Sequence, residues 1–190
     1  MNLGNIGVTT AWKILISPHK TNYSTSNLGP VLMSYQKYDS YRIDSEFVNT
    51  RGNTIQYSVF VPVKSGARVE KYQSLKMNCP CVIYCHSQQG CRIEGLFLQE
   101  FCIENGIGLC LFDFGGCGKS TGEFVTLGWK ETDDLAQMID LVTGNLRATQ
   151  ICLWGRSMGA VTSIMFAERS SFFISSMVGS ADSGLTLFGH

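Results

Sequence analysis

Three short runs of apolar residues, separated by helix-like segments, constrain the fold of this chain more than any other feature. The runs are residues 81–85, 107–112 and 151–154. Each is short and almost continuously apolar, which is typical of a strand that is buried on both faces. Residues 172–178 form a fourth candidate strand. Strands of this type usually form a parallel sheet that helices cover, so we expect an α/β fold.

The segments that follow the runs have the spacing of amphipathic helices. They are residues 94–104, 129–142 and 158–169. The apolar side chains expected on one face are Phe97, Leu98, Phe101 and Cys102 in the first segment and Leu135, Met138, Ile139 and Val142 in the second. Side chains at this spacing line one side of a helix and pack against a sheet. The alternation predicts βαβ units, with helices on both sides of a mainly parallel sheet.

The first part of the chain is organised differently. Residues 1–40 are rich in turn-forming residues, and we expect an irregular extension that lies over the core. Residues 41–50 and 54–63 are expected to form an antiparallel hairpin that turns at residues 51–53. The expected organisation is therefore an N-terminal extension at 1–40 and an α/β domain at 41–190.

Composition narrows the classes of partner. The 190 residues carry 15 basic and 15 acidic side chains, so the net charge is zero and nothing favours nucleic acid as a partner. No apolar run approaches the roughly 20 residues of a transmembrane helix. We expect an intracellular, cytoplasmic protein, with an organelle as the alternative because residues 1–38 carry three lysines and no acid.

The eight cysteines fall mostly inside apolar runs, where a free cysteine behaves as a small hydrophobic residue. They form no C-x-x-C pair and no Cys/His spacing typical of zinc. We therefore expect reduced thiols, and we expect neither a metal ion nor an organic cofactor.

A G-x-S-x-G pattern, Gly155-Arg156-Ser157-Met158-Gly159, lies between the third apolar run and the helical segment after it. That context is typical of a nucleophile elbow, a sharp turn that exposes the serine hydroxyl. Glycines on both flanks leave room for the neighbouring strand and helix. Ser157 is thus the candidate nucleophile, although the pattern alone also occurs in simple tight turns. Arg156 is interpreted as a solvent-facing or ion-paired charge.

Two further loops follow apolar runs, at the edge of the sheet where α/β proteins bind ligands. His86 follows the first run, and it is either a structural histidine or a catalytic one. The structural role is favoured, because in this architecture the base normally follows the serine in the chain. Residues 113–120 are rich in glycine and end in Lys-Ser. They lack the full G-x-x-x-x-G-K-[ST] pattern, so these glycines are expected to shape a turn rather than bind phosphate.

From about residue 81 to residue 178, the sequence resembles the α/β-hydrolase superfamily, and within it the serine aminopeptidase-like branch. Three motifs carry the resemblance: the loop His86-Ser87-Gln88-Gln89-Gly90-Cys91-Arg92, the D-x-x-G-x-G-x-S turn at Asp113, Gly116, Gly118 and Ser120, and the stretch Leu153-Trp154-Gly155-Arg156-Ser157-Met158-Gly159-Ala160. The resemblance implies an α/β-hydrolase-type mainly parallel sheet with flanking helices and an N-terminal antiparallel hairpin, truncated at its C-terminal side.

The resemblance also implies roles for single residues. Ser157 corresponds to the nucleophile, and the backbone N–H groups of Met158 and Gln88 correspond to the donors of the oxyanion hole. The family has glycine at the position of Ser87, a difference that restricts the approach of the backbone to the second donor.

The acid and the base of a serine hydrolase have no clear counterparts, because the family supplies them from later strands. Asp182 and His190 are the candidates, in the expected order after Ser157. Two functions follow. The first is a serine hydrolase that cleaves an ester, thioester or amide of a small acyl or peptide substrate through an acyl-enzyme. The second is a catalytically incomplete protein that serves as a structural or binding subunit, with a protein partner covering an exposed sheet edge.

Overall fold

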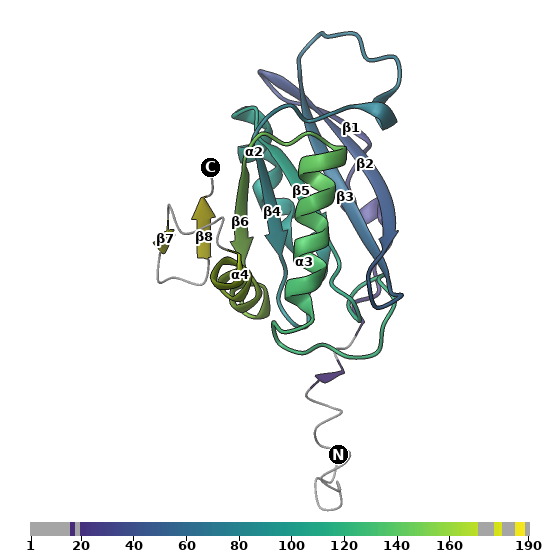
Figure 1. Ribbon diagram of the computed structural model, residues 1–190. Coiled ribbons are helices and arrows are strands. Elements are labelled where there is room, and N and C mark those ends of the chain that lie inside the picture. Colours follow the sequence, from purple (N-terminus) through teal and green to yellow (C-terminus); the bar gives the residue numbers. More distant parts are fainter. Residues whose placement is uncertain (1–15, 18–19, 171–176, 180–184, 189–190) are drawn as a thin grey trace, which may run out of the picture.

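The computed structural model describes residues 16–17, 20–170, 177–179 and 185–188. In this part of the chain, eight strands form one sheet in the order β1-β2-β3-β5-β4-β6-β8-β7 (Figure 1). The strands are β1 (Leu32–Ser34), β2 (Tyr38–Val48), β3 (Thr54–Lys64), β4 (Cys81–Cys85), β5 (Gly108–Phe112), β6 (Ile151–Gly155), β7 (Met177–Gly179) and β8 (Leu185–Phe188). The three apolar runs are thus β4, β5 and β6, as expected.

The sheet is mixed. Its centre is parallel, because β4 pairs in parallel with both β5 and β6. The hairpin β2–β3 pairs antiparallel over its whole length, from Val48 opposite Thr54 to Tyr38 opposite Lys64, and β3 joins the centre antiparallel to β5. The antiparallel share is larger than we expected, since β8 also runs antiparallel to β6 and to β7. The expected α/β-hydrolase-type sheet with an N-terminal hairpin is confirmed, and of residues 172–178 the strand β7 includes 177 and 178.

Helices cover both faces of the sheet. They are α2 (Gln99–Glu104), preceded by the 3-10 segment η4 (Arg92–Leu98), α3 (Glu131–Asp140), continued by the π-helical turn η5 (Leu141–Asn145), and α4 (Met158–Arg169). Figure 1 shows α3 and α4 on the near side of the sheet. Leu135 and Met138 of α3 and Ala167 of α4 belong to the core on that side, whereas Leu98 and Cys102 belong to the core on the other side.

Successive side chains of the central strands point to opposite faces of the sheet, and both faces are buried because helices cover them. In β4, Cys81, Ile83 and Cys85 pack into the core beneath α3 and α4, and Val82 and Tyr84 pack into the core beneath α2. The same alternation holds in β5 and β6. This explains why these runs are apolar throughout. Because β4 pairs in parallel with β5 and β6, the carboxyl ends of all three strands lie at one edge of the sheet.

Two sequence-based expectations differ from the structure. Phe97 and Phe101 were expected on the buried face of the helix, but they are 63% and 64% exposed. Phe97 lies in the 3-10 segment of residues 92–98, whose three-residue turn rotates its side chain away from the α-helical face. Phe101 lies in α2, whose buried side chains are those of Gln99, Cys102 and Ile103. In addition, β1 and the start of β2 lie within residues 1–40, and the side chains of Tyr23 and Leu28 are buried.

Candidate active site

Ser157 lies in the turn between β6 and α4, at the carboxyl edge of the sheet. Its backbone has φ +50° and ψ −117°, a conformation that L-residues rarely adopt. The residue is exposed, and its side chain makes no capping hydrogen bond to α4. A strained backbone and an exposed hydroxyl at a strand–helix turn are the geometry expected of a nucleophile elbow.

The flanking glycines are required by close packing. A Cβ at Gly159 would lie 1.9 Å from the carbonyl oxygen of Cys85, and a Cβ at Gly155 would lie 2.5 Å from backbone atoms of Ala160. The turn is also tied to β4, because the N–H of Arg156 donates a hydrogen bond to the same Cys85 carbonyl at 3.0 Å. The glycine positions of the motif therefore bring the first turn of α4 against the end of β4.

The carboxylate of Glu94 links the loop after β4, residues 86–90, to the elbow. Glu94 Oε2 accepts a hydrogen bond from the N–H of Ser87 at 2.8 Å, and Glu94 Oε1 accepts one from the Ser87 hydroxyl at 3.2 Å. Oε1 is also ion-paired with Arg156 Nη1. Ser87 is not among the described non-glycine residues with positive φ, so the serine fits here without backbone strain. Arg156 is both solvent-facing and ion-paired, as expected.

His86 is a structural residue. Its side chain is fully buried, its Nδ1 lies 2.7 Å from the carbonyl oxygen of Ser87, and its Nε2 accepts the N–H of Phe114 at 3.0 Å. Burial lowers the pKa of the imidazole, which favours the neutral ring. Because backbone groups occupy both ring nitrogens, His86 has none left to act as a base toward Ser157.

The D-x-x-G-x-G-x-S turn encloses a buried cluster. Asp113 is fully buried, and its carboxylate accepts hydrogen bonds from the Tyr23 hydroxyl at 2.5 Å and from the N–H groups of Arg92 and Lys119 at 2.7 and 3.0 Å. A Cβ at Gly118 would lie 2.4 Å from the Asp113 carboxyl carbon. The glycines of this turn therefore make room for a carboxylate of the same chain, which agrees with the turn-forming interpretation.

The sequence missed Tyr23 as part of this cluster. Its hydroxyl also accepts a hydrogen bond from Arg92 Nε at 2.5 Å, and its ring lies against the Arg92 guanidinium. Burial, with Asp113 beside it, raises the pKa of the Tyr23 hydroxyl, which therefore stays neutral. A lone tyrosine among turn formers gives no pattern by which this role could have been predicted.

Asp182 and His190 lie outside the described residues. Within those residues, no group of three or more His, Cys, Asp or Glu side chains is arranged to hold a metal ion. The described helices also include none that is long and apolar enough to cross a membrane.

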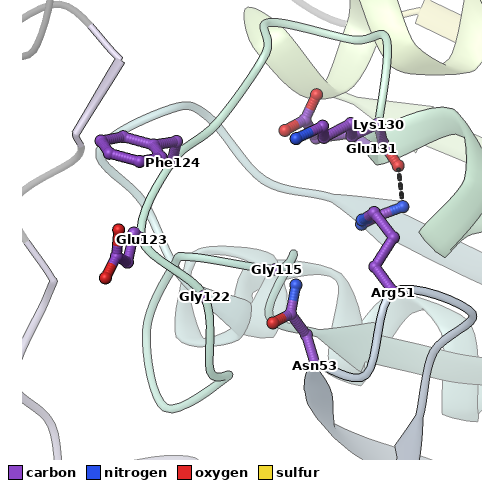
Figure 2. Close-up of a pocket in the computed structure, with 8 residues that line it drawn as sticks. All are labelled: Arg51, Asn53, Gly115, Gly122, Glu123, Phe124, Lys130 and Glu131. Atoms are coloured by element: carbon purple, nitrogen blue, oxygen red, sulfur yellow. Dashed lines mark hydrogen bonds between the residues drawn. The ribbon is translucent and has the colours of Figure 1, made fainter.

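A separate pocket of about 270 Å³ lies between the hairpin turn and the loop before α3 (Figure 2). Its lining residues are Arg51, Asn53, Gly115, Gly122, Glu123, Phe124, Lys130 and Glu131. On one side, Arg51 donates hydrogen bonds to the Lys130 carbonyl at 3.0 Å and to Asp134 at 2.6 Å. Burial raises the pKa of Asp134, and Arg51 partly offsets this. Ser157 does not line the pocket, so the two sites are distinct.

The sheet topology and the flanking helices are those of the α/β-hydrolase fold. The chain belongs to the X-Pro dipeptidyl-peptidase family (S15), whose profile matches residues 15–181. A comparison with curated proteins finds no match.

Solved structures resemble the chain at low sequence identity. Esterase Pf2001 of Pyrococcus furiosus superposes with a TM-score of 0.58 and 21% identity, over 82% of this chain and 52% of that one. The α/β hydrolase GrgF from Penicillium sp. sh18 has a TM-score of 0.55 and 22% identity, over 68% of this chain and 42% of that one. Est1E from Butyrivibrio proteoclasticus, solved with ferulic acid, has a TM-score of 0.53 and 25% identity, over 66% and 48%. The chain thus spans about half the length of these solved relatives.

Proposed function

We propose that the protein is a serine hydrolase that cleaves an ester, thioester or amide bond through an acyl-enzyme on Ser157. The observation that carries the proposal is the elbow itself. Ser157 holds a backbone conformation that costs about 1–3 kcal/mol. The residue is exposed, and its hydroxyl makes no capping hydrogen bond to α4. Such strain is retained where the surrounding structure enforces it, and it is most often found at functional sites.

The chemistry follows from the groups around the hydroxyl. Ser157 Oγ attacks the carbonyl carbon, its proton passes to a base, and the negative charge moves to the carbonyl oxygen. The N–H of Met158, in the first turn of α4, has no partner within the helix, and with the N–H of Gln88 it would stabilise that oxyanion. The leaving group departs with the proton from the base, and water then hydrolyses the acyl-enzyme.

Asp182 and His190 remain the proposed acid and base. Support comes from chain order, since both residues follow Ser157, and it agrees with the occupied ring nitrogens of His86. A base is needed, since a serine hydroxyl at its ordinary pKa is a weak nucleophile. His190→Gln and Asp182→Asn are therefore expected to lower kcat far more than KM if these two side chains serve Ser157.

The substrate class is tested by comparing acyl esters with proline peptides. The family name points to peptides with a residue before proline, whereas two of the structural neighbours are an esterase and a protein solved with an aromatic acid. We would measure hydrolysis of p-nitrophenyl acetate, an aromatic-acid methyl ester and an Ala-Pro p-nitroanilide by wild type and Ser157→Ala. Turnover of at least one substrate that Ser157→Ala abolishes is the expected result. Turnover that survives in Ser157→Ala would contradict the proposal.

A second candidate function is a binding subunit without catalysis. The observation that favours it is that His86 is the one histidine among the described residues, and backbone groups occupy both of its ring nitrogens. On this alternative, none of the three substrates is hydrolysed by the wild type, and the chain copurifies with a partner protein in a stable stoichiometric complex. Hydrolysis that depends on Ser157 would exclude it.

A further inference from the structure

We propose that Glu94 is a positioning residue that holds the loop of residues 86–90 against the nucleophile elbow; the proposal extends the serine hydrolase function proposed above. Glu94 lies in the first turn of η4 and contacts the residues that precede Gln88, one of the proposed oxyanion-hole donors, and Ser157, the proposed nucleophile. Its carboxylate bonds Ser87, the residue before Gln88, and Arg156, the residue before Ser157. Nothing in the G-x-S-x-G pattern indicates this link.

On the loop side, both oxygens of the Glu94 carboxylate accept hydrogen bonds from Ser87. Oε2 accepts a hydrogen bond from the Ser87 N–H at 2.8 Å, and Oε1 accepts one from the Ser87 hydroxyl at 3.2 Å, so the carboxylate binds both the backbone and the side chain of one residue. Hydrogen bonds to an ionised carboxylate are about twice as strong as those between neutral groups. The Glu94 side chain is only 16% exposed, which limits competition from water. Glu94 thus fixes the His86–Ser87 peptide and the Ser87 side chain, directly before the peptide that carries the Gln88 N–H.

The loop is shaped to receive the carboxylate. A Cβ at Gly90 would lie 2.3 Å from Glu94 Oε2, so any larger residue there would displace the side chain. The N–H of Gly90 returns to the carbonyl of Ser87 at 2.9 Å and closes a tight turn around Gln88. Gly90 and Ser87 therefore both contact the Glu94 carboxylate, and Gln88, the proposed oxyanion donor, lies between them in the chain.

On the elbow side, the partner is Arg156. Its guanidinium pairs with Glu94 Oε1, and its own N–H is fixed by the Cys85 carbonyl at 3.0 Å. Arg156 is 59% exposed, so the ion pair is screened and adds less than the Ser87 bonds. We therefore assign the positioning effect mainly to the two hydrogen bonds from Ser87 to Glu94. The ion pair with Arg156 connects Glu94 to the elbow and contributes less.

The test compares Glu94→Ala and Glu94→Gln with Glu100→Ala, a change at an exposed glutamate six residues later in the chain. Amide hydrogen exchange is measured on the full chain. In Glu94→Ala, the amides of residues 87–90 are expected to exchange at least about tenfold faster, whereas Glu94→Gln, which keeps an oxygen acceptor, shows a smaller increase. Glu100→Ala leaves these amides unchanged. Unchanged exchange at 87–90 in Glu94→Ala, or an equal rise throughout the chain, would overturn the proposal.

A second readout separates positioning from simple destabilisation. The rate of labelling of Ser157 by a fluorophosphonate is expected to fall about 10- to 100-fold in Glu94→Ala. Removal of an oxyanion-hole donor lowers the rate about 100- to 1,000-fold, and displacement of a donor lowers it less. Thermal midpoints identify any unfolded variant. If exchange rises as expected but wild type is never labelled, the role of Glu94 stands and the serine hydrolase proposal is contradicted. If wild type is labelled and Glu94→Ala is labelled equally fast, the role of Glu94 is contradicted.

Discussion

Gly159 packs so tightly against the carbonyl of Cys85 that no side chain fits between them. A Cβ at Gly159 would lie 1.9 Å from the Cys85 oxygen and 2.8 Å from the His86 oxygen. The first turn of α4 therefore rests directly on the backbone at the end of β4. This contact sets the distance between Ser157 and the loop that carries Gln88, and with it the spacing of the proposed catalytic groups.

Gly159→Ala is expected to lower the free energy of unfolding by about 3 kcal/mol or more, because both obstructing atoms belong to backbone that cannot rotate away. Gly144→Ala is the matched control. Gly144 lies in the helical turn η5, is exposed, and has no atom within 4 Å of an added Cβ. It is expected to change stability by less than about 1 kcal/mol, in the stabilising direction. Urea denaturation measures both, and equal effects at the two positions would contradict the packing argument.

The strain at Ser157 predicts an inverted order of stability. Because its φ is +50°, Ser157→Gly should be more stable than Ser157→Ala by about 1 kcal/mol. At Glu168, an exposed position within α4, the ordinary helical order should hold, with Glu168→Ala more stable than Glu168→Gly by about 1 kcal/mol. Thermal unfolding of the four variants tests the comparison. The same order at both positions would mean that Ser157 is not strained.

The repeated patterns of the chain were predictable from sequence, and single long-range contacts were not. The runs that became β4, β5 and β6 are apolar because both faces are covered, and the elbow was evident from Gly155 and Gly159. The exposure of Phe97 was not predictable, since a 3-10 segment and an α-helix share similar apolar spacing. The pairing of Glu94 with Arg156 joins residues 62 positions apart, and no local pattern encodes it.

Tyr23→Phe tests whether the N-terminal segment is part of the folded core. The change removes hydrogen bonds to two buried charged groups, Asp113 and Arg92, and should lower the free energy of unfolding by about 1.5–3 kcal/mol. Tyr72→Phe is the control, because the Tyr72 ring stacks on Tyr41 at 6.4 Å, a contact that the substitution preserves. It should cost less than about 0.5 kcal/mol. If Tyr23→Phe is as stable as Tyr72→Phe, the contacts of Tyr23 with Asp113 and Arg92 do not contribute to the stability of the folded core, which would contradict the prediction.

Stability should depend on pH through His86. Burial lowers the pKa of the folded imidazole, so below the ordinary value of about 6.5 the unfolded chain binds a proton that the folded chain does not. Stability is therefore full above that pH and falls as the pH drops toward the folded pKa, by at most about 1.4 kcal/mol per pH unit. His86→Gln should flatten this slope between pH 6.5 and 5. An unchanged slope would mean that another group causes it.

The most direct test of the central claim is covalent labelling of Ser157. The protein and its Ser157→Ala variant are treated with a fluorophosphonate, and the adduct is located by peptide mass mapping. The account predicts a single adduct in wild type, on the peptide that contains Ser157, and none in Ser157→Ala. No adduct in correctly folded wild type, or an adduct that persists in Ser157→Ala, would contradict it.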